Sequence, residues 1–327
     1  MEKMNKNKNT LKEIAEILMA SKSVLLFTHI NMDGDTLGSS VALCIALRKL
    51  GKQAHILIED DIAAFLQFLD KDYCTYDNHV IENPDICLCI DCGDADRFKE
   101  RKQKFFEGKQ KGCIDHHVTT EPFADFNYID PTASATGEIV YELLKEMPIQ
   151  IDKEIGSAIF AAITTDTGNF QYSNTTKKTH LIAAELCDYG VDYNEISVEL
   201  YQNNRLEKLL LQTKALQELI VFAKGQAAIC GVTQKMFEET QGKMEETEGM
   251  IETLRNISGI EVSIFVKEIE PNKCKVSMRS KKFVNVAEMS QKLNGGGHAR
   301  AAGCTIYQSF EETKKTMIKL VEEYLKG

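Results

Sequence analysis

Short apolar runs and helical repeats alternate along the first part of the chain. The continuous apolar runs predict buried strands, at 23–28, 53–59, 85–90 and 111–114. The segments between them carry apolar residues at helical spacing and predict helices, at 10–21, 36–51 and 61–70. Strands that alternate with helices predict an α/β fold, here a parallel sheet with helices on both faces.

The pattern changes twice further along the chain. From Ser134 to about Ile220 it is helical throughout. Beyond that point four apolar runs predict strands, at 225–232, 261–269, 273–280 and 303–308, and a last helix is expected at 309–327. We therefore expect a parallel-sheet domain at 1–195, a helical connector at 196–222 and a smaller α/β domain at 223–327.

Composition narrows the class of protein. The chain has 327 residues, of which 43% are hydrophobic, enough for well-developed cores. It has no apolar stretch of membrane-spanning length and begins with a polar segment, so we expect a cytoplasmic protein that does not bind membranes. The ten cysteines are scattered, and only Cys89 and Cys92 have the spacing of a zinc-ligand pair. A structural zinc or redox protein needs a second pair, so reduced core thiols are expected.

The formal net charge is −10, which argues against a protein that coats long duplex nucleic acid. It leaves room for a short anionic substrate held by metal ions, because local charge can differ from the total. The segment 260–300 is such a local exception, with eight Lys or Arg and four Glu.

Acidic residues and histidines directly follow three of the predicted strands. They are His29, Asp33 and Asp35 after 23–28, Asp91 after 85–90, and Asp115, His116 and His117 after 111–114. Asp166, at the end of an apolar helical segment, is a fourth candidate. The carboxyl ends of parallel strands meet at one edge of a sheet, so we expect these side chains to lie together. A single Asp after a strand is usually a helix cap, but four such clusters are not explained by capping.

The residue types indicate a site for two divalent metal ions. Carboxylates with imidazoles suit Mn, Fe or Zn, and the charge of four aspartates is balanced by two dications. Two such ions would activate a water and stabilise the oxygens of a phosphate ester during hydrolysis.

Four segments resemble the motifs of the DHH phosphoesterase family: "THINMDGDTLGS" at 28–39, "IDCGDADRF" at 90–98, "IDHH" at 114–117 and "TDTGNF" at 165–170. A fifth, "GGGHARAAG" at 295–303, is similar to the signature of the DHH-associated C-terminal domain. The two-domain arrangement resembles the branch of nanoRNases (oligoribonucleases) that are also 3′-phosphoadenosine-5′-phosphate (pAp) phosphatases. The fifth segment argues against the manganese pyrophosphatases, which share only the motifs of the first domain.

The resemblance implies a role for each residue. His29, Asp33 and Asp91 would hold one metal ion, and Asp35, Asp91, His116 and Asp166 would hold a second, with Mn the ion that the family usually binds. His117 would face the substrate phosphate, and Asp115 would orient the histidines. The catalytic residues expected on this basis are His117 and Asp115. With Asp33 and Asp35 assigned to different ions, Gly34 between them would let the turn direct the two side chains apart.

The glycine-rich segment near the C-terminus is expected to bind substrate. It follows a helical pattern and precedes a strand, the reverse of the order in a dinucleotide-binding loop. Glycines allow a backbone to approach a ligand, and an arginine fork matches phosphate oxygens. The expected substrate contacts are Arg279, Gly295, Gly296, Gly297, His298 and Arg300.

The function implied is two-metal hydrolysis of phosphate esters in short nucleotides: exonucleolytic degradation of short oligoribonucleotides to mononucleotides and conversion of pAp to AMP. The expected partners are short oligoribonucleotides, dinucleotides or pAp, and the sequence is compatible with a homodimer. Two alternatives stay open, a phosphodiesterase for cyclic-di-AMP or pApA and a non-catalytic nucleotide sensor. A sensor would be expected to lack some of the metal ligands, and none is missing.

Overall fold

The computed structural model describes residues 9–325, and of His298 only the backbone. The chain folds into two compact units, which divide between Asn203 and Asn204. The predicted connector at 196–222 spans this division, because α8 (Leu206–Gln217) packs within the second unit, against β8 and α9.

The first unit is built on a parallel sheet with the strand order β3-β2-β1-β4-β5-β6. Its strands are β1 (Ser23–Phe27), β2 (Gln53–Leu57), β3 (Cys74–Thr75), β4 (Ile86–Ile90), β5 (Gln110–Asp115) and β6 (Phe126–Ile129). β1 and β4 are buried over their whole length, which explains why they are continuously apolar in sequence. The α/β class with a parallel sheet, predicted from the sequence, is confirmed.

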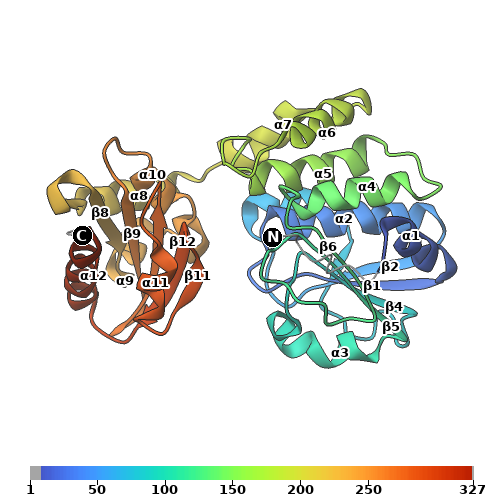
Figure 1. Cartoon of the computed structure of the whole chain (residues 1–327), viewed down its shortest axis with the longest axis horizontal. Helices are drawn as coiled ribbons and strands as arrows, with labels where there is room; N and C mark the ends of the chain where they lie inside the picture. The colour runs from blue at the N-terminus through green and yellow to red at the C-terminus, as the bar shows by residue number, and fades with distance from the viewer. Residues whose placement is uncertain (1–8, 326–327) are drawn as a thin grey trace. The chain divides into compact units, whose positions relative to one another are not determined.

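Helices cover both faces of this sheet (Figure 1). The helices of this unit are α1 (Leu11–Ala20), α2 (Gly34–Lys49), α3 (Lys102–Glu107), α4 (Thr136–Lys145), α5 (Lys153–Asp166), α6 (Lys177–Asp188) and α7 (Tyr193–Ser197). Of these, α6 and α7 pack on α5. One face of the sheet, which carries Leu26, Ile56 and Leu88, is buried under α1, α2, α4 and α5. Phe98 and Phe105 cover the other face against Leu25 and Phe27. The segment predicted as a helix at 61–70 forms only a short 3-10 helix, Ala64–Leu69.

The strand order places a topological switch point between β1 and β4. From β1 the chain first moves outward to β2 and β3, and then returns to the other side of β1 to form β4, β5 and β6. Ligands of open α/β sheets bind beyond the carboxyl ends of the strands at such a point. The sequence clusters that follow β1, β4 and β5 therefore meet at this edge.

The second unit is a mixed sheet with the order β11-β12-β10-β9-β8-β7, in which only β8 and β9 are parallel. Its strands are β7 (Ile220–Phe222), β8 (Ala227–Val232), β9 (Val262–Glu270), β10 (Lys273–Ser280), β11 (Gly296–His298) and β12 (Ala301–Ile306). Its helices besides α8 are α9 (Gln234–Thr240), α10 (Met250–Arg255), α11 (Val286–Gln291) and α12 (Phe310–Leu325). α11 and α12 bury one face of the sheet, and α8 to α10 cover part of the other.

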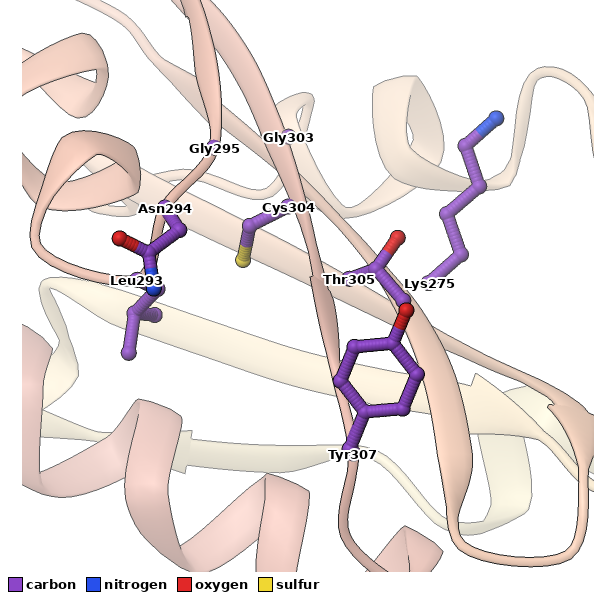
Figure 2. Close-up of a pocket in the computed structure, with 8 residues that line it drawn as sticks. All are labelled: Lys275, Leu293, Asn294, Gly295, Gly303, Cys304, Thr305 and Tyr307. Atoms are coloured by element: carbon purple, nitrogen blue, oxygen red, sulfur yellow. The ribbon is translucent and has the colours of Figure 1, made fainter.

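β12 lies near the edge of this sheet and is only partly protected. β11 pairs with it from Ala301 to Gly303 and then ends. Beyond Gly303 the outer edge of β12 has no strand partner among the described residues. A hollow of about 500 Å3 lies along this edge (Figure 2).

Two further findings bear on the expectations from composition. No helix within residues 9–325 has both the length and the apolar character needed to cross a membrane. All ten cysteines are free thiols, and most are buried, as expected for reduced core residues.

Candidate metal centre

The loop after β1 and the start of α2 carry the first three site residues. His29 is buried two residues beyond the end of β1. Asp33 is the N-cap of α2, and its Oδ1 accepts hydrogen bonds from the backbone N–H of Asp35 and Thr36 at 3.1 and 3.0 Å. The sequence puts this cap here because a carboxylate satisfies the free N–H groups of a helix start. Asp35, the second residue of α2, is 1% exposed.

His29, Asp33 and Asp91 form one set of metal-type ligands. The Nε2 atom of His29 lies 3.5 Å from Asp33 Oδ2 and 3.7 Å from Asp91 Oδ2. Asp91 directly follows β4 in a left-handed backbone conformation, with φ of 58°, which is uncommon for a residue other than glycine. Its backbone N–H donates to the Ile114 carbonyl of β5 at 2.9 Å, which ties the two strand ends together.

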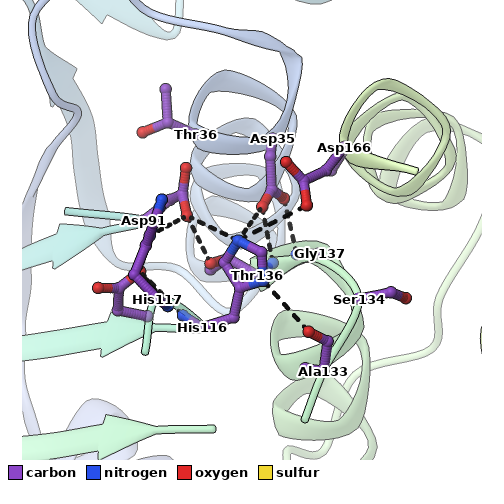
Figure 3. A network of polar contacts seen from close by, with 12 residues as sticks. Asp35, Thr36, Asp91, His116, His117, Ala133, Ser134, Thr136, Gly137 and Asp166 are labelled. Carbon is purple, nitrogen blue, oxygen red and sulfur yellow. Dashed lines mark hydrogen bonds and ion pairs between the residues drawn. The ribbon is translucent and has the colours of Figure 1, made fainter. Parts of the chain in front are cut away.

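His116 is at the centre of a second set (Figure 3). Its Nε2 atom lies 3.7 Å from each of three carboxylate oxygens, Asp35 Oδ2, Asp91 Oδ1 and Asp166 Oδ2. Asp166 is the last residue of α5. Asp91 thus presents Oδ2 to the first set and Oδ1 to the second, so the two sets share one carboxylate.

Hydrogen bonds fix the ring orientation of two of the histidines. His29 Nδ1 donates to the Ile30 carbonyl at 2.8 Å, and His116 Nδ1 donates to the Ala133 carbonyl at 3.2 Å. A carbonyl only accepts, so Nδ1 carries the proton in both rings, and the lone pair of each Nε2 is free to bind a metal ion. Metal-binding histidines commonly use such a bond to a backbone carbonyl.

Asp115 and His117 form a pair beside the two sets. Asp115 is fully buried at the end of β5. Its Oδ1 accepts from His117 Nδ1 at 2.7 Å and from the backbone N–H of His116 at 2.8 Å, and Thr120 donates to its other oxygen. The His117 side chain is 32% exposed. Asp115 can therefore orient both histidines but cannot itself touch a substrate.

Burial and crowding raise the pKa of most of these carboxyl groups. Burial together with Asp166 and Asp33 raises the pKa of Asp35 to about 7, although His116 opposes the shift. Burial raises the pKa of Asp166 to about 6 and that of Asp91 well above its usual value. Asp33 differs: burial would raise its pKa, but the hydrogen bond and charge of His29 lower it to about 2.

These carboxylates fit divalent cations. Several acids crowded into a buried space resist ionisation unless positive charge is supplied, and bound metal ions supply it. The donor atoms are carboxylate oxygens and imidazole nitrogens, which suit Mn, Fe or Zn rather than a thiolate site. Cys92, next to Asp91, does not compete, because burial raises its pKa to about 12.

Residues that the sequence analysis did not single out hold the ligands in place. They lie in the segment 133–137 at the start of α4. The backbone N–H groups of Thr136 and Gly137 donate to the two oxygens of Asp35 at 2.7 and 2.9 Å. The Thr136 hydroxyl donates to Asp91 Oδ1 at 2.8 Å, and the carbonyl of Ala133 accepts from His116. One short segment therefore contacts a ligand from each of three motifs.

A second support comes from the loop before α6. The side-chain amide of Asn174 donates to the Ser134 carbonyl at 2.9 Å and to Asp166 Oδ2 at 3.3 Å. It joins the end of α5 to the segment 133–137. In sequence these residues look like ordinary cap and turn residues, so their only signal was the presence of "SAT" just before a helix.

Gly34 has a different function from the one expected. Its φ is not positive, so the turn does not need glycine for its backbone conformation. A Cβ atom there would lie 2.4 Å from Thr165 Oγ1. The missing side chain lets the start of α2 pack on the end of α5, which brings Asp35 close to Asp166.

The expected substrate residues all lie in the second unit. Arg279 is on the partly exposed face of β10, and its Nε lies 3.4 Å from Glu252 of α10. Arg300 Nη1 donates to the Val284 carbonyl at 2.8 Å, so part of its guanidinium stabilises the backbone of the second unit. The side chain of His298 lies outside the described residues.

The three glycines differ in what they do. A Cβ on Gly295 would lie 2.4 Å from the Gly303 carbonyl, and one on Gly297, whose φ is 139°, 2.5 Å from the Ala301 carbonyl. Close packing of β11 on β12 thus explains both. Gly296 faces open space, and packing does not require it to be glycine.

Comparison with known proteins agrees with the geometry. Residues 23–163 match the N-terminal domain of the DHH family, and residues 224–327 match the DHHA1 domain. A curated protein of Thermus thermophilus, "Bifunctional oligoribonuclease and PAP phosphatase NrnA", is 32% identical over 90% of this chain and 87% of its own. The protein of the same name from Bacillus subtilis is 30% identical over 94% and 96% of the two chains.

Solved structures share the fold. An exopolyphosphatase-related protein from Bacteroides fragilis superposes with a TM-score of 0.89 at 24% identity, and the match covers 96% of each chain. A structure of the exonuclease RecJ bound to manganese has a TM-score of 0.54 at 16% identity, over 97% of this chain and 94% of that one. The matching domains, the full-length relatives and the buried carboxylate and histidine cluster lead to one conclusion: the chain belongs to the DHH family of metal-dependent phosphoesterases.

Proposed function

We propose that this phosphoesterase acts on short nucleotides, degrading short oligoribonucleotides to mononucleotides and removing the 3′-phosphate of pAp to give AMP. The observation that carries the proposal is the pair of ligand sets that share Asp91, in a chain similar over most of its length to proteins named for these two activities. Its substrates are thus short RNA, dinucleotides or pAp rather than long duplexes.

We assign the metal ligands by the two sets. His29, Asp33 and Asp91 would hold one ion, and Asp35, Asp91, His116 and Asp166 the other. We propose Mn²⁺ for both, because hard carboxylate oxygens with imidazole suit it. When bound, the two ions would supply Lewis-acid charge to the phosphate oxygens and lower the pKa of a water.

The side chains around the ligands have separate tasks. Asp115 accepts a hydrogen bond from Nδ1 of His117, which leaves Nε2 on the exposed side of the ring. When Nε2 also carries a proton, it can donate to a phosphate oxygen, and the Asp115 carboxylate balances the charge of the ring. Asp115 acts only through this histidine. Thr136 orients the carboxylate of Asp91, which both sets share, and Asn174 orients that of Asp166.

The second unit contributes substrate binding. Arg279 lies on the partly exposed face of its sheet and offers a planar fork for a phosphate group. Gly296, which packing does not require, lies where a nucleotide could approach the backbone. His298 is the last residue of β11, and Arg300 lies in the turn that leads to β12.

Hydrolysis of cyclic-di-AMP or pApA is the second candidate, because the same ligand sets would act on any phosphodiester. A comparison of kcat/KM with Mn²⁺ for RNA of two to five nucleotides, pAp, pApA and cyclic-di-AMP separates the candidates. We expect the highest values for short RNA and pAp. A preference for cyclic-di-AMP would select the second candidate, and binding without turnover of any compound would select a nucleotide sensor.

A further inference from the structure

The hollow at the free edge of β12 is the feature that the proposed function leaves unused. It has a volume of about 500 Å3, within the range of small-molecule sites and large enough for one nucleotide. It is lined by Lys275 of β10, by Asn294 and Gly295 of the turn before β11, and by Thr305 and Tyr307 at the end of β12. Figure 2 shows Asn294 on one side of the β12 backbone and Lys275, Thr305 and Tyr307 on the other.

Register explains why three of these side chains lie on one face. Lys275 is paired with Thr305 across the antiparallel strands β10 and β12. Tyr307 follows Thr305 by two residues, and all three are exposed. Directly opposite residues and those two positions along point to the same side of a sheet.

The polar groups of this patch have no partners of their own. Lys275 makes no hydrogen bond or ion pair with any of residues 9–325, and its partner across β10 and β9 is another cation, Lys267. The Tyr307 side chain is 77% exposed, the most exposed large aromatic side chain in the described part of the chain. The outer edge of β12 beyond Gly303 also lacks a strand partner. A cation, an aromatic face and backbone groups are therefore free together.

The same face of β10 continues toward Arg279. Lys275, Ser277 and Arg279 alternate with buried residues along the strand, so their side chains form one row. At a rise of about 3.4 Å per residue, Lys275 is about 14 Å from Arg279 along the strand. This distance is longer than one nucleotide, so a nucleotide that contacts Arg279 would not fill the hollow.

We infer that this hollow, named here the β12 subsite, binds a further nucleotide of an oligoribonucleotide whose phosphate contacts Arg279. The inference rests on the proposed function. Tyr307 stacks on the base, Lys275 contacts a phosphate further along the strand than the one on Arg279, and Asn294 and the free edge of β12 offer hydrogen bonds to the base. Single-stranded RNA is generally bound by this combination of aromatic stacking and positive charge. The compound pAp has a single nucleoside and leaves the subsite empty.

The test is a comparison of substrate lengths. We expect Lys275→Ala and Tyr307→Ala to lower kcat/KM for an RNA trinucleotide relative to pAp by about tenfold each, the loss typical of one stacked base. Tyr307→Phe keeps the ring and Lys275→Arg keeps the charge, and each should restore most of the ratio. The matched control is Lys319→Ala, an exposed lysine on α12, which covers the opposite face of the sheet; it should leave the ratio unchanged.

A second measurement separates this inference from the proposed function. The dissociation constants of the same trinucleotide and of pAp are measured in EDTA, where no hydrolysis takes place. If the wild-type protein hydrolyses both compounds but the variants lose activity equally on each, the β12 subsite is refuted and the function stands. If the wild-type protein hydrolyses neither, the proposed function fails, and the ratio of the two dissociation constants in the variants decides the inference.

Discussion

The two units manage charge in opposite ways. In the first unit Asp35, Asp91 and Asp115 are almost completely buried, and each accepts hydrogen bonds from named groups of the fold. In the second unit Lys275 is exposed and has no partner among the described residues, and Arg279 has a single acidic neighbour. Buried charges need hydrogen-bond partners in the fold because their desolvation is costly, whereas exposed charges are solvated by water until a ligand binds.

This difference in charge burial indicates a separate task for each unit. Side chains must be fixed in position where charge develops during a reaction, because the donors and acceptors must already be oriented. Exposed side chains that are not fixed are sufficient where a site only has to bind a substrate. Changes in the first unit should therefore alter kcat, and changes in the second should alter KM.

The sharpest test removes the shared carboxylate. Asp91→Asn should lower kcat by about a thousandfold or more, because both ligand sets lose an anionic oxygen at once. Turnover with Mn²⁺ is measured together with the number of ions bound per chain. Asp94→Asn is the control, since Asp94 is an exposed helix cap and Asn also caps. Near-normal turnover of Asp91→Asn would refute the two-metal assignment.

The next effect concerns the support of a ligand. Thr136→Val removes the hydroxyl that donates to Asp91 Oδ1 and keeps the shape of the side chain. We expect kcat or metal affinity to fall about 10- to 100-fold, as is usual when a group that orients a metal ligand is lost. Thr136→Ser keeps the hydroxyl and should retain most activity. If Ser and Val are equally impaired, the threonine acts through packing instead.

A smaller effect is expected in the second unit. Arg279→Ala should raise KM for short RNA about tenfold and leave kcat within about twofold. The reason is that the arginine would bind the ground state and the transition state equally well. Arg279→Lys should be intermediate, since a lysine keeps the charge but not the fork. A large decrease in kcat at unchanged KM would mean that this arginine acts in the transition state, and the contrast between the units would fail.

The smallest effect is on stability and depends on pH. Asp35 and Asp166 have raised pKa values, about 7 and about 6, so in metal-free protein the folded state resists their ionisation. The folded state then binds more protons than the unfolded state, and the free energy of unfolding falls as pH rises from about 5 to about 7. Mn²⁺ favours the ionised carboxylates and should offset this loss.

The measurement is thermal unfolding in EDTA and in Mn²⁺. We expect a decrease of a few degrees in Tm in EDTA over this pH range, and a larger gain from Mn²⁺ at the higher pH. Asp35→Asn should flatten the dependence on pH in EDTA. A Tm in EDTA that rises between these pH values in the wild-type protein would contradict the assignment.

The sequence could predict the fold class because buried parallel strands are continuously apolar, as β1 and β4 are. It also placed the ligand clusters, since charged residues stand out directly after such strands. It could not reveal Thr136 or Asn174, because a neutral residue that orients a ligand looks like any cap or turn residue. It misjudged Gly34, whose requirement comes from Thr165, a residue distant in sequence.

The short segment 133–137 has a consequence for how this protein matures. The proposed metal ligands are spread over more than a hundred residues of sequence, and the segment contacts Asp35, Asp91 and His116 only when β1, β4, β5 and α4 are all in place. Pairings between segments so far apart form late in folding. We therefore expect an incompletely folded first unit to present separate weak ligands and to bind metal ions less tightly than the completed one.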